Sequence, residues 1–208
     1  MFELLSADTP NGKKVSILLE ELGLQYKVTK INIYKGDQFK PSFSKISPFN
    51  KIPVLKDVKT KKYIFESGAI LIYLGEKYKK FYDKKNRLKI LQWLMAQMAY
   101  VGPMFGQHHQ FHHYNHGKSK FGEERYFKIS TQIYKDLDKR LSKSKFLACS
   151  KYTIADIATF PWVARHEIHD IGLKKFKNLS RWFEKISKRK AVIKGYDFMN
   201  RGEIIPKP

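Results

Sequence analysis

Two hydrophobic periods divide the chain. Up to about residue 80, short apolar or alternating stretches are separated by stretches with apolar side chains every three or four positions. Residues 26–33 (YKVTKINI) show the first pattern, which predicts a strand, and residues 13–22 show the second, which predicts a helix. Beyond about residue 87 only the helical period continues. The pattern predicts a region of mixed strands and helices followed by a region of helices alone.

The first region predicts the order β-α-β-(α)-β-β-α. We expect strands at residues 2–5, 26–33, 53–55 and 63–65, helices at residues 13–22 and 66–79, and a polar connection over residues 34–50. A βαβ unit followed by a hairpin and a closing helix indicates a mixed sheet with helices packed on it.

The second region predicts four helical stretches, at residues 88–110, 121–141, 153–168 and 179–187, with an interruption of the first at Gly102-Pro103. Charged residues 81–87 form the expected linker, so we predict one domain at residues 1–80 and an all-helical domain at residues 87–208. Thr153 and Asp156 have the spacing of a capping box, for which we predict a structural role.

Charge is the most extreme feature of the composition. The 208 residues include 41 basic and 19 acidic ones, for a formal net charge of +22. Such a balance raises the hypothesis of a nucleic-acid partner. Lysine supplies most of the basic residues and is scattered along the chain, whereas arginine is the more usual choice for specific phosphate contacts. We interpret the charge as compositional bias and expect neither a nucleic-acid nor a membrane partner.

Cysteine usage and hydropathy indicate a cytoplasmic protein. Cys149 is the one cysteine, so no intrachain disulfide can form and no Cys-x-x-Cys motif exists. No apolar run approaches the ~20 residues of a membrane span, and the N-terminus does not read as a secretory signal.

Three segments of the first region carry candidate chemistry. The Ile52-Pro53 bond precedes a predicted strand, where a cis form would expose the backbone of Ile52 to a peptide ligand and a trans form would simply open an edge strand. Glu66 and Ser67 begin a predicted helix, where free N–H groups favour a carboxylate, although serine there is often only a cap.

The third segment is Thr9-Pro10-Asn11, between the first strand and the first helix. A thiolate at a helix N-terminus is favoured by the helix dipole and by hydrogen-bond donors. Thr9 and Asn11 supply such donors through a hydroxyl and an amide. The alternative is an ordinary turn that caps the helix.

The joint order of these segments resembles nu-class glutathione transferases of bacteria. The motifs that carry the resemblance are Thr9-Pro-Asn-Gly, Lys35-Gly-Asp-Gln-Phe, Ile46-Ser-Pro-Phe-Asn-Lys-Ile-Pro and Phe65-Glu-Ser-Gly-Ala-Ile, followed by Gly102-Pro-Met-Phe-Gly-Gln and Tyr152-Thr-Ile-Ala-Asp-Ile-Ala. The resemblance implies an α+β thioredoxin-like domain plus an all-α bundle, a cis Pro53 and a homodimer. It also implies glutathione as co-substrate and glutathione-dependent reduction of disulfides without a protein cysteine nucleophile.

The resemblance also implies a role for eight residues. Thr9 and Asn11 would act catalytically at the glutathione sulfur, and Gln38, Lys51, Ile52, Pro53, Glu66 and Ser67 would bind the rest of glutathione. One position departs from the pattern: Gln132 stands where the family often has an arginine that reaches a neighbouring subunit's site. That departure leaves open whether one or two glutathione molecules are held.

Five histidines lie between positions 108 and 116. On a helix, His108, His112 and His116 would share one face with metal-chelating spacing. No carboxylate ligand or His-Glu-x-x-His motif accompanies them, so we expect no metal.

Two further hypotheses stand beside the enzyme. A glutathione transferase-like fold can serve as a non-catalytic binding or regulatory module. A nucleic-acid binder, motivated by charge alone, would lose affinity steeply with salt.

Overall fold

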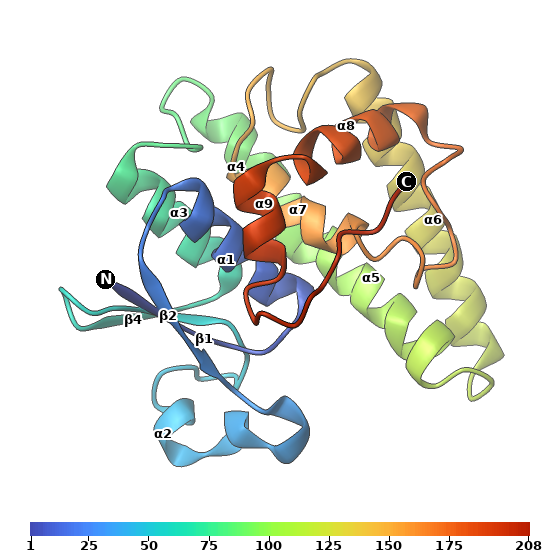
Figure 1. The fold of residues 1–208 in the computed structure, drawn as a ribbon. Coiled ribbons are helices and arrows are strands. Elements are labelled where there is room, and N and C mark those ends of the chain that lie inside the picture. Colours follow the sequence, from blue (N-terminus) through green and yellow to red (C-terminus); the bar gives the residue numbers. More distant parts are fainter. The chain divides into compact units, whose positions relative to one another are not determined.

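The computed structural model describes all 208 residues, which form two units (Figure 1). The first unit comprises Met1–Tyr82 and Arg189–Ile204, and the second comprises Asp83–Lys188 and Ile205–Pro208.

A four-stranded sheet forms the centre of the first unit. Its strands are β1 (Phe2–Ser6), β2 (Tyr26–Lys30), β3 (Val54–Asp57) and β4 (Lys62–Phe65), in the order β2-β1-β3-β4. β1 runs parallel to β2 and antiparallel to β3, and β3 runs antiparallel to β4, which confirms the predicted mixed sheet. Because β3 is an inner strand, the edge-strand interpretation of Pro53 is wrong.

Helices cover both faces of this sheet. α1 (Pro10–Glu21) and α3 (Ser67–Tyr78) lie on one side, and the short α2 (Pro41–Ser44) lies on the other (Figure 1). The connection after β2 also contains two 3-10 turns, at Ile33–Lys35 and Asp37–Phe39. Every residue of α1 from position 12 to 19 is buried, because the sheet, α3 and α9 all pack against this helix.

The last helix, α9 (Lys190–Tyr196), packs on α1 and therefore belongs to the first unit. The Ser16 hydroxyl donates to the Gly195 carbonyl at 2.6 Å. A Cβ at Gly195 would lie 2.6 Å from the Cα of Ile17, so the two helices can approach this closely only with glycine there. The helical domain predicted for residues 87–208 thus differs from the observed unit, since residues Arg189–Ile204 leave it. A seven-residue helix has too few positions to show a clear period.

The second unit consists of helices. They are α4 (Arg87–Ala96), α5 (Gly102–His108), α6 (Lys120–Ser142), α7 (Ile154–Val163) and α8 (Lys177–Ser187). At the predicted interruption, the chain stays helical through a π-helical segment, Gln97–Val101, which precedes Pro103 in the first turn of α5. Proline lacks an N–H and cannot donate to the carbonyl of the preceding turn, and the wider π-helical turn lies at the place where that hydrogen bond is lost. None of the helices combines the length and apolar character needed to cross a bilayer.

Asp156 connects three parts of the second unit. The predicted capping box is present, with Asp156 Oδ2 accepting from Thr153 N at 3.0 Å. The Oδ1 atom also accepts from Leu147 N at 2.8 Å and from Trp182 Nε1 at 2.9 Å. A carboxylate that is fully buried therefore joins the loop before α7, the start of α7 and helix α8.

We expect Asp156→Ala to lower the free energy of unfolding of the helical unit by about 3 kcal/mol or more, because it leaves several buried donors without an acceptor. All three tryptophans, Trp93, Trp162 and Trp182, lie in this unit, so urea unfolding followed by tryptophan fluorescence measures it. Asp136→Ala, at an exposed position of α6, is the matched control and should change stability by less than about 0.5 kcal/mol. Equal effects of the two substitutions would contradict the role assigned to Asp156.

Candidate functional site

A small pocket of about 160 Å³ in the first unit brings together six of the eight residues predicted for the site. Its lining residues are Asn11, Ser47, Phe49, Lys51, Ile52, Pro53, Phe65, Glu66 and Ser67. They come from the starts of α1 and α3 and from the segments that flank β3 and β4. The two predicted residues outside this lining are Thr9 and Gln38.

The start of α1 places Asn11 at the pocket. Thr9 is the N-cap residue, and its Oγ1 accepts from Gly12 N at 3.2 Å. Pro10 occupies the first turn, so Asn11 lies next to the N-terminal N–H groups of the helix. Thr9 thus has the capping role that the turn-and-cap alternative predicted, and its hydroxyl proton remains able to donate.

The segment before β3 forms the second wall. The Ile52-Pro53 bond is cis. Pairing of β3 with both neighbours begins at Val54, so the backbone of Ile52 stands outside the sheet ladder. Ser47, a residue that sequence reasoning missed, holds this segment: its Oγ donates to Lys51 O at 2.7 Å and accepts from Lys51 N at 3.1 Å. The available signal was that a serine can bond through its side chain to the backbone of a residue a few positions along the chain.

Glu66 and Ser67 form the third wall, at the start of α3. Ser67 is the first residue of the helix and is 5% exposed. Glu66 is exposed and has a φ of 68°, a left-handed value that a non-glycine residue seldom adopts. Such conformations cost of order 1–3 kcal/mol and concentrate at functional sites. The sequence carried no signal for this backbone conformation.

Lys14 lies beneath this wall and was also missed. Its side chain is almost completely buried, and Nζ donates to Ser67 Oγ at 3.5 Å. Burial lowers the pKa of Lys14 to about 7, and the nearby Glu66 carboxylate opposes that shift. The available signal was its spacing, because a residue four positions before Leu18 shares the buried face of the helix.

Gln38 lies away from the pocket lining, in the second 3-10 turn. Its Nε2 donates to Ile33 O at 3.2 Å, which ties the side chain to the preceding turn. Its Oε1 is buried and has no hydrogen-bond partner. Gln38 therefore retains an acceptor that a ligand N–H or water could satisfy.

Two other candidate features lie in the helical unit. Cys149 is partly buried, and its Sγ contacts Lys151 O at 3.6 Å. His108 is buried and its Nε2 lies 2.9 Å from His169 O. His116 lies beyond the π-helical segment His109–Tyr114, which continues α5. The structure contains no group of three or more His, Cys, Asp or Glu side chains that could hold a metal ion.

Gln132, the position that departs from the family pattern, lies on the exposed face of α6. Its Nε2 donates to Asp136 Oδ1 at 3.0 Å, one helical turn along. The amide is thus bonded within its own helix.

Comparisons with known proteins identify the family of this chain. Residues 9–77 match the glutathione S-transferase N-terminal domain, and residues 95–190 match the glutathione S-transferase C-terminal domain. The chain is 40% identical over 199 residues to the disulfide-bond oxidoreductase YfcG of Escherichia coli, covering 92% of this chain and 93% of that protein. A second E. coli protein, the disulfide-bond oxidoreductase YghU, is 35% identical over 213 residues, covering 93% of this chain and 73% of that protein.

Solved structures give the same result. A glutathione transferase from Burkholderia graminis, with two glutathione molecules bound per subunit, has a TM-score of 0.89 and 38% identity, covering 97% of this chain and 89% of that one. A glutathione transferase from Pseudomonas putida, with one glutathione disulfide bound per subunit, has a TM-score of 0.86 and 38% identity, covering 94% of this chain and 90% of that one. With both domain models matched and these relatives aligned over most of its length, the chain belongs to the glutathione S-transferase family of enzymes.

Proposed function

We propose that this protein binds glutathione and uses its thiolate to reduce disulfides. The observation that carries the proposal is the meeting of Asn11, the cis Ile52-Pro53 segment and the Glu66–Ser67 helix start in one pocket. The names of the two E. coli relatives and the glutathione in the solved neighbours support the same chemistry.

The start of α3 is suited to the γ-glutamyl end of glutathione. The backbone N–H and hydroxyl of Ser67 would donate to the α-carboxylate, which the positive end of the helix dipole also favours. The exposed Glu66 carboxylate would pair with the α-ammonium. The backbone of Ile52 would bond to the cysteinyl unit, while Lys51 and Gln38 would approach the glycyl carboxylate.

The start of α1 is suited to the sulfur. Thr9 and Asn11 would donate hydrogen bonds to the thiolate, and the helix dipole would lower the pKa of the thiol. The thiolate attacks one sulfur of a disulfide, forms a mixed disulfide on glutathione and releases the other sulfur as a thiolate. A second glutathione thiolate then attacks the mixed disulfide, which gives glutathione disulfide and the second reduced thiol. No protein cysteine takes part in either step.

Lys14 would position the two residues that bind the γ-glutamyl end, Ser67 and Glu66. Its bond to Ser67 Oγ directs the serine oxygen, and its charge interacts with Glu66. Because both partners line the pocket, a change at Lys14 reaches the ligand through them.

The assembly proposed is a cytoplasmic homodimer with a thioredoxin-like glutathione-binding domain and a helical domain. A second glutathione in each site would have to be held without an arginine at Gln132. The alternative function, a binding or regulatory module without chemistry, predicts glutathione binding without turnover.

We expect Asn11→Ala to lower kcat/KM for hydroxyethyl disulfide reduction by about tenfold or more, because it removes a donor to the reacting sulfur. Cys149→Ser should retain wild-type activity, measured in the same glutathione-coupled assay. An inactive Cys149→Ser variant would overturn the mechanism. Retention on glutathione-agarose without turnover of any disulfide, hydroperoxide or aryl halide would favour the non-catalytic module.

We expect Lys14→Met to change how stability depends on pH. The folded-state pKa of Lys14 is about 7, below the ordinary lysine value of ~10.4, so the unfolded chain binds more protons between these two pH values. The contribution of Lys14 to stability therefore rises with pH across that window and is lowest below pH ~7. Lys14→Met should gain stability relative to wild type near neutral pH and lose that advantage in alkali, as measured by urea unfolding with far-UV circular dichroism.

Lys30→Met, at an exposed position of β2, is the control and should shift stability equally at all pH values tested. A pH-independent difference between Lys14→Met and wild type would contradict the burial of a titrating ammonium. Separately, if Lys14 positions Ser67, Lys14→Met should raise KM for glutathione more than it lowers kcat.

A further inference from the structure

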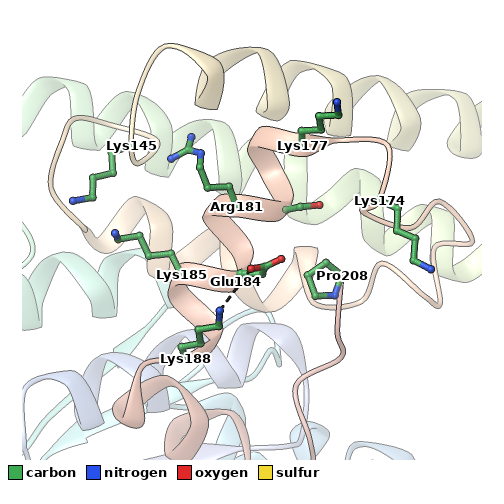
Figure 2. Close-up of a pocket in the computed structure, with 9 residues that line it drawn as sticks. Lys145, Lys174, Lys177, Arg181, Glu184, Lys185, Lys188 and Pro208 are labelled. Carbon is green, nitrogen blue, oxygen red and sulfur yellow. Dashed lines mark ion pairs between the residues drawn. The ribbon is translucent and has the colours of Figure 1, made fainter.

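An open pocket of about 920 Å³ lies over α8 in the helical unit, and the glutathione pocket proposed above lies in the other unit (Figure 2). Its lining residues are Lys145, Lys174, Lys177, Ser180, Arg181, Glu184, Lys185, Lys188 and Pro208. Six of these nine residues are basic and one is acidic.

The positive charge in this pocket is mostly unneutralised. Its one acidic side chain, Glu184, pairs with Lys188 at 3.7 Å. The other four lysines of the lining, Lys145, Lys174, Lys177 and Lys185, have no acidic partner within ion-pair distance. What distinguishes these lysines from the other exposed lysines of the chain is that they line one concavity together with Arg181.

Three of these cations converge at one end. Lys145 comes from the loop after α6, and Arg181 and Lys185 lie one turn apart on α8. Figure 2 shows their three side chains gathered on the same side of the pocket. The charge of Lys145 lowers the pKa of Lys185, and desolvation and the charge of Arg181 add to the shift. A bound anion between these groups would convert their repulsion into attraction.

Arg181 is held in place at this end. Its Nη2 donates to Leu141 O at 2.6 Å and to Ser144 O at 3.4 Å. These bonds fix the guanidinium at the junction between the end of α6 and the following loop. A fixed guanidinium loses little rotamer freedom when an anion binds, which favours recognition at this position.

The size and lining of the pocket select among anions. The pocket is open and all its charged side chains are exposed, so a ligand would bind there mainly through its charges. The lining contains no aromatic side chain on which nucleic-acid bases could stack. Lysine ammonium groups, together with the charge of Arg181 and its remaining N–H groups, are suited to phosphate oxygens. Figure 2 shows Lys177 and Lys174 at the opposite end of the pocket from Lys145. Lys177 and Lys185 are eight residues apart on α8, about 12 Å along the helix axis, which is longer than one orthophosphate.

We propose that this pocket is a binding site for a small oligophosphate, whose linked phosphates span from the Lys145–Arg181–Lys185 end to the Lys177 end. The phosphate chain is the recognised chemistry, and it occurs both in inorganic polyphosphate and in nucleoside triphosphates.

Isothermal titration calorimetry of the full chain tests the site, with sodium tripolyphosphate, adenosine triphosphate and orthophosphate as ligands at low and at physiological salt. We expect tripolyphosphate to bind more tightly than orthophosphate and to weaken as salt rises. Tighter binding of adenosine triphosphate than of tripolyphosphate would assign the ligand to nucleotides, and equal or weaker binding would assign it to the phosphate chain alone.

The double variant Lys145→Gln/Lys185→Gln should weaken tripolyphosphate binding by about tenfold or more, because it removes two converging charges. The double variant Lys84→Gln/Lys89→Gln removes the same charge from exposed positions of the same unit and should bind like wild type. Glutathione-dependent activity should be unchanged in both variants.

Three results would overturn the proposal. One is the absence of tripolyphosphate binding at low salt. Another is equally weakened tripolyphosphate binding in the two double variants, which would show that binding depends on the overall charge of the protein and not on this pocket. The third is tighter binding of an oligothymidine than of tripolyphosphate through the same lysines, which would make the pocket part of a nucleic-acid surface.

Discussion

The burial of α1 with two lysines on it is the constraint around which the first unit is organised. An ammonium group removed from water is costly unless charges or hydrogen-bond acceptors surround it. Lys13 has Asp8 and Glu203 as ion-pair partners and lies 3.9 Å from the centre of the Tyr196 ring. Lys14 has Ser67 and the charge of Glu66.

These partners connect α1 to distant parts of the unit. Tyr196 ends α9 and Glu203 follows it, so Lys13 ties the late segment of the chain to the start of α1. Lys14 ties the same helix to the start of α3. The two helix starts that line the pocket are therefore fixed to each other by the need to accommodate buried charge.

Most of the fold followed from hydrophobic period, and the exceptions have physical causes. Alternation predicted the second strand, short apolar stretches predicted the other three, and the helical period predicted the long helices because it repeats over several turns. Short α9 escaped detection because its place depends on Gly195 meeting Ile17, a contact between residues far apart in sequence. The hydrogen bonds of Asp156 with Leu147 and Trp182 were not predicted either, because they also join residues far apart in sequence. The spacing of Thr153 and Asp156 predicted only the local capping box.

The sequence predicted the site residues that lie beside a helix start or a strand start. It did not predict those whose role depends on contacts between segments distant in sequence. Asn11, Ile52-Pro53 and Glu66–Ser67 were recognisable because each stands beside a helix start or strand start that the pattern itself predicts. Lys14 was missed although its spacing from Leu18 places it on the buried face of the helix, because a lysine in an amphipathic helix ordinarily faces solvent. The same limit applies to charge: the scattered lysines of α8 and its surroundings are unremarkable along the chain. Folding brings Lys145 against Lys185, and only that approach separates a local cation cluster from a lysine-rich composition.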